Sequence, residues 1–429
     1  MKTADWLTPN GFRGHFPAPG LEVAPKSVRG QPVSRFHYMI RRALPLALIF
    51  LLLPSLLAQE PHFDGRKKEL EYPGPGREEP EPTGLSEVRI GYFGPSDPSH
   101  PLGGDLWLAA QLALEEVNSE GGYRGLPFRL LPAWSENPWG SGISDLTRLV
   151  YNQQLWALIG GIDGPSTHLV EQVTTKARLP LIGPSSTDKT VNYAYVPWMF
   201  SMLPTDQLQA PLLCARVADA LNGKNRLAVV SANDHDSHLA ALEFKSFLAK
   251  RGISPFRDLE VKNGSQPDIA EGVRELLSSK PDVVLLVANA IDSARLVRAL
   301  KESRSQAKIF GGSAFGRRFF VETAGPEADG AVFPLLDSES AAHVRFRQKY
   351  ASRFGHSPDF AATQTYDAVH LLAQAIRKAG LNHALIRDAL RQLSGWEGAN
   401  GVVRWDAVGQ NSRAVRLGTY RNGQIQEVK

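Results

Sequence analysis

The side chains best suited to chemistry in this sequence are few and do not form a known catalytic set. Ser313 lies in Gly311-Gly-Ser-Ala-Phe, which lacks the final glycine of a nucleophile elbow, so we interpret it as a loop serine at a strand end. His235 and His238 could both face a metal ion, but they lie in the polar run 233–238 and no third ligand is indicated. We therefore expect no catalytic residue and no metal site, and we predict that this run is a solvated or cleft-lining loop.

The sequence also contains neither a cysteine pair nor a recognisable phosphate-binding motif. Cys214 is the single cysteine, which excludes an intramolecular disulfide, and its apolar helical surroundings at 210–221 predict a buried, inert thiol. The loop that begins at Gly94 lacks the glycine spacing of a dinucleotide site, and no Walker-type Gly-Lys-Ser/Thr occurs. The sequence therefore predicts no cofactor.

Length and charge limit the class of protein. A chain of 429 residues is too long for one ordinary core and predicts two compact lobes. The 48 Lys and Arg residues only slightly outnumber the 44 Asp and Glu residues and form no basic stripe, so we expect no nucleic-acid partner.

The N-terminal region has the pattern of an export signal. Arg41 and Arg42 precede the apolar run 43–58, which ends in a small residue before a polar stretch, as in a secretory signal peptide. The run is shorter than the roughly 20 apolar residues that span a bilayer comfortably, although an uncleaved membrane anchor is the alternative. We assign 1–59 to an N-terminal extension plus signal peptide, with Met39 as a second candidate start, and predict a periplasmic or other extracytoplasmic location.

The remaining chain alternates between strand and helix patterns. We expect strands at 88–93, 126–134, 155–160, 179–183, 226–231, 254–261, 282–288 and 308–311, with helices at 103–118, 145–154, 166–177, 239–251, 269–278 and 292–303. Helices at 341–354 and 361–379 and strand-like segments at 401–405 and 413–420 follow. This alternation predicts an α/β protein with two doubly wound parallel-sheet lobes.

The expected boundaries follow from this pattern. Residues 60–85 are rich in Pro, Glu and Gly and predict a disordered linker. We assign 86–203 to the first part of lobe 1, 204–333 to lobe 2, 334–399 to a return to lobe 1, and 400–429 to C-terminal strands mainly of lobe 2. The chain would cross between the lobes near 203–206, 333–336 and 400–404, which together would form a hinge.

Several short motifs resemble one known family. Asn118-Ser-Glu-Gly-Gly-Tyr-Arg-Gly is similar to the turn after the first helix in the branched-chain (Leu/Ile/Val) amino-acid-binding proteins of ABC transporters, which have the periplasmic binding protein type I fold. Further similar stretches occur in the same order at 157–161, 179–187, 200–206, 366–376 and 398–406. The resemblance covers roughly 86–425 and implies an extracytoplasmic solute-binding protein. Its partners would be a small polar organic ligand, captured by hinge closure, and the permease of an ABC transporter.

The ligand site should lie beyond the carboxyl ends of the strands, where loops and helix N-termini offer free amide donors. The candidate ligand-binding residues are Asp163, Ser166, Thr167, Ser185, Ser186 and Thr187 in lobe 1, and His235, Asp236, Asn289 and Ser313 in lobe 2. Helix capping and turn formation are the alternative roles for the lobe 1 side chains.

The expected ligand class depends on a departure from the family. The family holds a ligand carboxylate with lobe 1 hydroxyls and amides, and the ammonium group with aromatic and acidic groups of lobe 2. Here the polar run 233–238 replaces the usual tyrosine after the first lobe 2 strand, and Ser313 occupies the acidic position. Asp234, Asp236 and Asp292 could substitute, but spacing does not orient them. We therefore predict a small carboxylate, amide or other polar organic solute, with a branched-chain amino acid as the alternative.

Two other functions stay open at this point. The same fold serves ligand-sensing receptors and regulatory modules, although this sequence carries no visible output domain. The second alternative is an enzyme that uses a cleft carboxylate such as Asp163 or Asp236. No convincing pair of base and nucleophile accompanies either residue.

Overall fold

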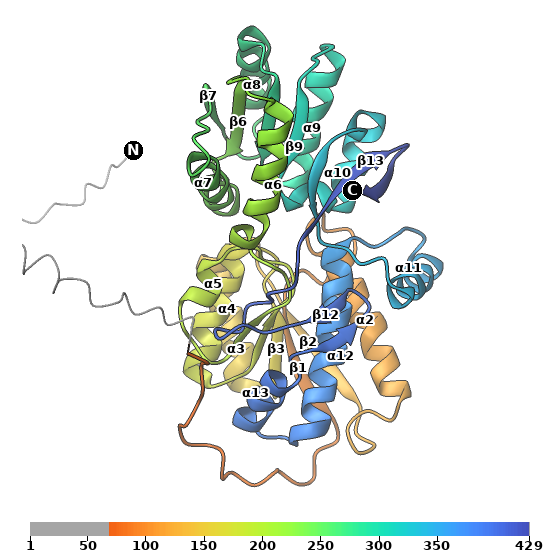
Figure 1. Cartoon of the computed structure of the whole chain (residues 1–429). Helices are drawn as coiled ribbons and strands as arrows, with labels where there is room; N and C mark the ends of the chain where they lie inside the picture. Colours follow the sequence, from red (N-terminus) through yellow and green to blue (C-terminus); the bar gives the residue numbers. More distant parts are fainter. Residues whose placement is uncertain (1–67, 429) are drawn as a thin grey trace, which may run out of the picture. The chain divides into compact units, whose positions relative to one another are not determined.

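The computed structural model describes residues 68–428 (Figure 1). The predicted signal peptide, the second candidate start at Met39 and the first part of the predicted linker lie outside these residues. Within the described part of the chain, none of the helices combines the length and apolar character needed to cross a membrane.

Lobe 1 is built on a five-stranded parallel sheet with the strand order β2-β1-β3-β4-β5. Its strands are β1 (Val88–Phe93), β2 (Phe128–Ala133), β3 (Ala157–Gly160), β4 (Leu181–Gly183) and β5 (Met199–Ser201). Strands β3 and β4 of this sheet are fully buried, because helices cover both of its faces.

The helices of lobe 1 come from two distant parts of the chain. They are α2 (Gly104–Ser119), α3 (Ile143–Asn152), α4 (Gly164–Ala177), α5 (Thr190–Tyr193), α11 (Ala341–Phe354), α12 (Phe360–Ala379) and α13 (His383–Gln392), with a π-helical turn at Pro138–Gly142. Figure 1 shows the blue α12 beside the orange α2, and these two helices pack against each other. One face of the sheet packs against α2, α12 and α13, and the other packs against α3 and α4. A two-stranded ribbon of β11 (Trp396–Gly398) and β12 (Gly401–Val403) follows α13.

Lobe 2 has a seven-stranded sheet with the order β14-β13-β10-β9-β8-β6-β7. Its strands are β6 (Leu227–Ala232), β7 (Arg257–Val261), β8 (Val283–Val287), β9 (Lys308–Gly311), β10 (Val332–Leu335), β13 (Arg416–Arg421) and β14 (Gln424–Glu427). The first five are parallel, whereas β13 and β14 add an antiparallel edge. The prediction of two doubly wound α/β lobes is therefore confirmed, with a mixed sheet in lobe 2.

The helices of lobe 2 cover both faces of its sheet. They are α6 (Asp206–Leu221), α7 (His235–Ala249), α8 (Gln266–Ser279), α9 (Ala290–Glu302) and α10 (Arg318–Ala324), with 3₁₀ turns at Ser313–Gly316 and Gly325–Ala328. Helices α6 and α7 pack on one face, and α8, α9 and α10 pack on the other. Cys214 of α6 is fully buried, as predicted, and burial raises the pKa of its thiol to about 12.

The chain crosses between the lobes three times. The crossings are the segments 202–205, 336–340 and 404–415. The second and third lie farther along the chain than predicted, because β10 still belongs to the lobe 2 sheet and residues near Gly409 are still tied to lobe 1. The Ser201 amide donates to the Gly409 carbonyl at 2.9 Å, and Asn411 Nδ2 donates to the Met202 carbonyl at 2.7 Å.

The prediction of a disordered linker is wrong for residues 68–85. Arg77 Nη2 lies 2.6 Å from Asp388 Oδ2, and Glu81 Oε2 lies 2.7 Å from Arg124 Nη1. Composition predicted disorder because this segment buries little apolar surface of its own. The segment instead runs along lobe 1 and is held there by polar contacts with residues that are distant in sequence.

Candidate ligand-binding cleft

A cavity of about 430 Å³ lies between the two lobes. Almost every segment that lines it follows the carboxyl end of a strand. In lobe 1 these strands are β1, β3, β4 and β5, and in lobe 2 they are β6, β7, β8 and β9. Phe360, at the start of α12, is the exception. The cavity therefore occupies the place where open parallel sheets bind their ligands, as the sequence predicted.

Seven of the ten predicted site residues line this cavity. They are Asp163, Ser185 and Thr187 of lobe 1 and His235, Asp236, Asn289 and Ser313 of lobe 2. The structure thus brings together side chains from both lobes that lie up to 150 residues apart, since Asp163 and Ser313 belong to one cavity. Their contact with a ligand stays a prediction.

The other three predicted residues, Ser166, Thr167 and Ser186, do not line the cavity. Ser166 and Asp163 form a capping box at the start of α4, in which the Ser166 amide donates to Asp163 Oδ1 at 2.9 Å. Thr167 Oγ1 donates to the Asp163 carbonyl at 2.6 Å, and Ser186 Oγ accepts from the Asp188 amide at 3.2 Å. These hydroxyls satisfy local backbone groups, which was the alternative role considered for them.

Sequence reasoning missed several charged residues of the cleft. Asp206, Arg295 and Arg317 line it, as do Asp234 and Asp292, which had been considered only as substitutes. Asp234 and Asp292 each follow a predicted lobe 2 strand closely, and this position could have identified them. Arg317 carried no such signal, because the 3₁₀ turn that directs it toward the cleft follows β9 without a helical pattern.

Burial changes the charge of these acids. Burial, together with the nearby charge of Asp163, raises the pKa of Asp236 to about 7, against a hydrogen bond that lowers it. Burial also raises the pKa of Asp206 well above its usual value, although Thr187 donates a hydrogen bond to it. Asp234 differs from both. Its Oδ1 caps α7 through the Ser237 amide, whereas its buried Oδ2 has no hydrogen-bond partner among the described residues.

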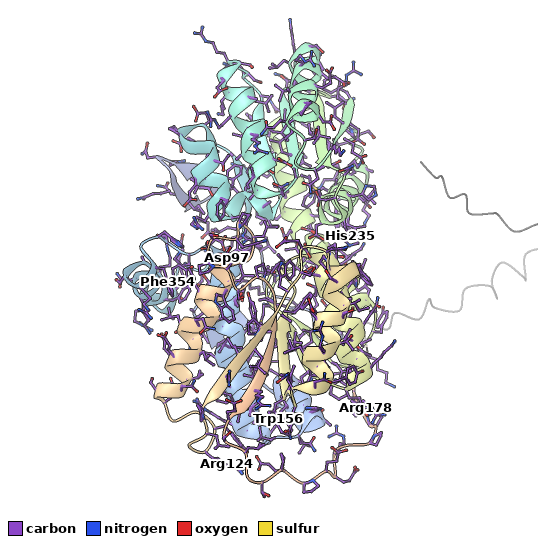
Figure 2. All side chains as sticks on the ribbon, turned by 180° about the vertical axis from the view of Figure 1, so that it is seen from behind. Asp97, Arg124, Trp156, Arg178, His235 and Phe354 are labelled. Carbon is purple, nitrogen blue, oxygen red and sulfur yellow. The ribbon has the colours of Figure 1, made fainter. Side chains whose placement is uncertain are left out.

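On one side of the cleft, the N-terminus of α4 meets the N-terminus of α7. The Gly164 amide of lobe 1 donates to Asp236 Oδ2 at 3.0 Å and to Oδ1 at 3.2 Å. A Cβ atom on Gly164 would overlap the Asp236 carboxylate, so this approach requires glycine. Figure 2 shows the neighbouring His235 where the lobes meet, with Arg178, at the other end of α4, far from the cleft.

On the other side, two arginines that follow β9 reach into lobe 1. Arg317 Nε lies 2.6 Å from Asp359 Oδ2, and its Nη2 donates to the Leu102 carbonyl at 2.8 Å. Arg318 holds Asp105 with two nitrogens, at 2.7 and 3.1 Å. The lobes are therefore joined by charged and polar contacts on both sides of the cavity.

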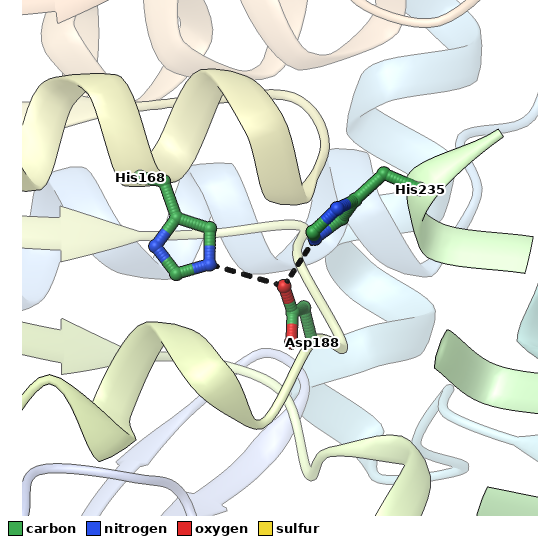
Figure 3. Close-up of side chains that lie close together, drawn as sticks. All are labelled: His168, Asp188 and His235. Atoms are coloured by element: carbon green, nitrogen blue, oxygen red, sulfur yellow. Dashed lines mark hydrogen bonds and ion pairs between the residues drawn. The ribbon is translucent and has the colours of Figure 1, made fainter. Parts of the chain in front are cut away.

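The polar run 233–238 is not a loop throughout, because α7 already begins at His235. His238 is exposed and lies 3.9 Å from Glu260, so it does not pair with His235. His235 instead meets His168 and Asp188 of lobe 1 (Figure 3). Hydrogen bonds from His168 and His235 hold the pKa of Asp188 below its usual range, although burial opposes this. Asp188 and, less strongly, Glu171 raise the pKa of His168 to about 9.

Comparison with known proteins agrees with this architecture. Residues 87–424 match the family model described as periplasmic binding protein. An amino acid binding protein of Pseudomonas aeruginosa is 24% identical over 70% of this chain and 80% of its own. Leu/Ile/Val-binding protein homolog 7 of Brucella melitensis is 21% identical over 79% of this chain and 90% of its own.

Solved structures show the same fold. The branched-chain amino acid transporter substrate binding protein LivJ from Streptococcus pneumoniae, in complex with isoleucine, has a TM-score of 0.72 at 23% identity, covering 80% of this chain and 99% of its own. A solute binding protein of an ABC transporter from Rhodopseudomonas palustris, in complex with 3,4-dihydroxy benzoic acid, has a TM-score of 0.70 at 18% identity, covering 80% and 96%. The matched family model spans nearly the whole described chain, and this chain belongs to the periplasmic binding protein family.

Proposed function

We propose that this protein is exported, captures a small polar organic solute between its lobes, and delivers it to the permease of an ABC transporter. The main support for this proposal is a cavity of about 430 Å³ that is lined by segments following the carboxyl ends of strands from both sheets. This volume lies within the usual range of small-molecule sites, roughly 300–1,000 Å³. The similar amino acid binding protein of Pseudomonas aeruginosa, and the similar structures in complex with isoleucine and with 3,4-dihydroxy benzoic acid, support a solute of this size.

Among amino acids, amides and carboxylates, the charges of the cleft favour a ligand that carries an ammonium group. Five aspartates line the cavity, Asp163, Asp206, Asp234, Asp236 and Asp292, against two arginines, Arg295 and Arg317. Burial raises the pKa of Asp206 well above its usual value and that of Asp236 to about 7, so these two acids contribute less negative charge than the other three. Asp292 is already engaged by Arg295 and by the Gly264 amide. Asp234 Oδ2 is buried and unpartnered within residues 68–428, and an ammonium donor would compensate it. Asp234, whose orientation could not be predicted from sequence spacing, therefore favours an amino acid over a plain carboxylate as the ligand.

Capture would work by hinge closure. The three crossings allow the lobes to move relative to each other, and a ligand that contacts both lobes stabilises the state in which they meet. Ser185 and Thr187 would bind the ligand from lobe 1, and Asp234 and Asn289 would bind it from lobe 2.

A thermal-shift screen tests this function. Amino acids, amides, carboxylates and aromatic acids are added separately, and a true ligand raises the free energy of unfolding by about 2.7 kcal/mol at 100 times its Kd. Calorimetry on the best compound then compares Ser185→Ala and Asp234→Asn with the control Ser186→Ala, because Ser186 does not line the cavity and its hydroxyl accepts from the Asp188 amide. The two cleft variants should lose about tenfold in affinity or more. A screen without any stabilising compound, or equal affinity in all three variants, would argue against the proposal.

A further inference from the structure

Two histidines and an aspartate converge where α4 and α7 meet. His168 lies in α4, Asp188 lies in the loop after β4, and His235 is the first residue of α7. Asp188 Oδ2 is 3.2 Å from His168 Nε2 and 2.8 Å from His235 Nε2. The three candidate ligand atoms all lie within 4.8 Å of one another (Figure 3).

This donor set matches the chemistry of zinc. Zinc sites combine imidazole nitrogens and carboxylate oxygens at about 2.0–2.2 Å, which separates tetrahedral ligand atoms by about 3.3 Å. The separations of Asp188 Oδ2 from the two histidine nitrogens, 3.2 and 2.8 Å, are close to this value, and the two nitrogens lie no more than 4.8 Å apart. A metal ion would then replace the hydrogen bonds that Asp188 now accepts from the two rings.

Further groups orient the three side chains, as occurs around bound metals. The other ring nitrogen of His168, Nδ1, lies 3.5 Å from Glu171 Oε2. Glu171 is 97% buried, being 3% exposed, and its Oε1 has no hydrogen-bond partner in the described part of the chain. Asp188 Oδ1 accepts from both the amide and the hydroxyl of Thr190 at 2.7 Å, which leaves Oδ2 directed at the histidines. A carboxylate behind a ligating histidine fixes the ring and increases its basicity.

We propose that His168, Asp188 and His235 form a divalent metal site of the zinc type that bridges the two lobes. Two ligands come from lobe 1 and one from lobe 2, so the site is complete only when the lobes are in contact. Three protein ligands leave one tetrahedral position for water. Metal binding therefore stabilises the contacting state of the lobes independently of the organic ligand.

Calorimetry with Zn²⁺ alone tests the site, at about pH 8, because Zn²⁺ must displace protons from its ligands and binds more weakly at lower pH. The unmodified protein should bind one Zn²⁺ per chain. Glu171→Gln should weaken this binding by about 10- to 100-fold, and His168→Gln or His235→Gln should weaken it by more. His238→Gln is the matched control, because His238 lies in the same helical turn as His235, is exposed and faces Glu260. Co²⁺ should give the visible absorption of a tetrahedral site in the unmodified protein and in this control.

Small-angle scattering tests the bridge. Zn²⁺ should reduce the radius of gyration of the unmodified protein and of His238→Gln, but not that of His235→Gln. His235 is partly exposed, so its variant should stay folded. The metal site is overturned if the unmodified protein does not bind Zn²⁺. It is also overturned if His168→Gln and His235→Gln both bind Zn²⁺ as tightly as the unmodified protein does. The bridge is overturned if only His168→Gln loses binding. No organic ligand is present, so these outcomes do not depend on the proposed function.

Discussion

Asp236 of lobe 2 caps a helix of lobe 1, because both of its carboxylate oxygens accept a hydrogen bond from the Gly164 amide at the start of α4. The first amides of a helix have no partner within the helix, and an acid from the other lobe satisfies one of them here. A ligand-free protein can therefore hold its lobes together with its own side chain at a place where anionic ligand groups commonly bind.

We expect Asp236→Ala to shift the ligand-free protein toward separated lobes, since the lost hydrogen bond is worth about 1–3 kcal/mol. Gly164→Ala should act in the same direction, because its methyl group would overlap the Asp236 carboxylate. Small-angle scattering measures the radius of gyration of each variant. Asp258→Ala, which removes an exposed lobe 2 aspartate paired with Lys245, is the control. Scattering curves that coincide with those of the unmodified protein would show that this contact does not hold the lobes.

We also expect the ion pair of Arg317 with Asp359 to contribute to the stability of the fold. Asp359 is 4% exposed, so Arg317→Met leaves a buried carboxylate without its charged partner. We expect a loss of about 3 kcal/mol in the free energy of unfolding, measured with urea. The exposed pair of Arg148 with Asp145 provides the control, because Arg148→Met should cost less than about 1 kcal/mol. Equal losses in the two variants would contradict this difference.

Ser166 should affect stability and leave ligand affinity unchanged. Its Oγ accepts from the amides of Ile162 and Asp163 at 3.0 and 3.3 Å, and both amides lose their acceptor in Ser166→Ala. The expected cost is about 1–2 kcal/mol of unfolding free energy, with the Kd of the ligand from the screen unchanged. Ser246→Ala, at an exposed position of α7, should be nearly neutral. A large loss of affinity in folded Ser166→Ala would instead show that this hydroxyl contributes to ligand binding.

The secondary structure of the two lobes was predictable, because the apolar periodicity of each strand and helix lies within a short stretch of sequence. The fully apolar strand β8 and the helices that alternate with the strands follow from residues near each other in sequence. The start of α7 was missed because its first turn, His235 to His238, is polar and its apolar periodicity begins only at Leu239. The capping aspartate, Asp234, was the available signal for that start.

The contacts between the lobes were not predictable from one sequence. His168 and His235 lie 67 residues apart and meet at Asp188 only because the chain crosses to lobe 2 between them. Residues 68–85 show the same limitation. Their composition predicts disorder, but the acid and base partners that hold them, such as Arg124 and Asp388, lie far along the chain.

Burial of His343 predicts how stability depends on pH. This histidine of α11 is 3% exposed, and burial, with the nearby charges of Arg347, Arg413 and Arg416, lowers its pKa from 6.5 to about 4. Between these two pH values the unfolded chain binds a proton that the folded chain does not. His343 therefore destabilises the fold increasingly as pH falls from about 6.5 to about 4, by at most about 1.4 kcal/mol per pH unit.

His343→Leu removes this titration and the buried Nδ1, which has no hydrogen-bond partner among residues 68–428. We expect the variant to gain stability relative to the unmodified protein, and the gain should grow as the pH is lowered through this window. Urea unfolding at several pH values measures the difference in free energy at each pH. His238→Leu, which removes an exposed histidine, controls for the loss of a histidine as such. A difference that stays constant or shrinks at acidic pH would show that His343 does not stay neutral in the folded protein.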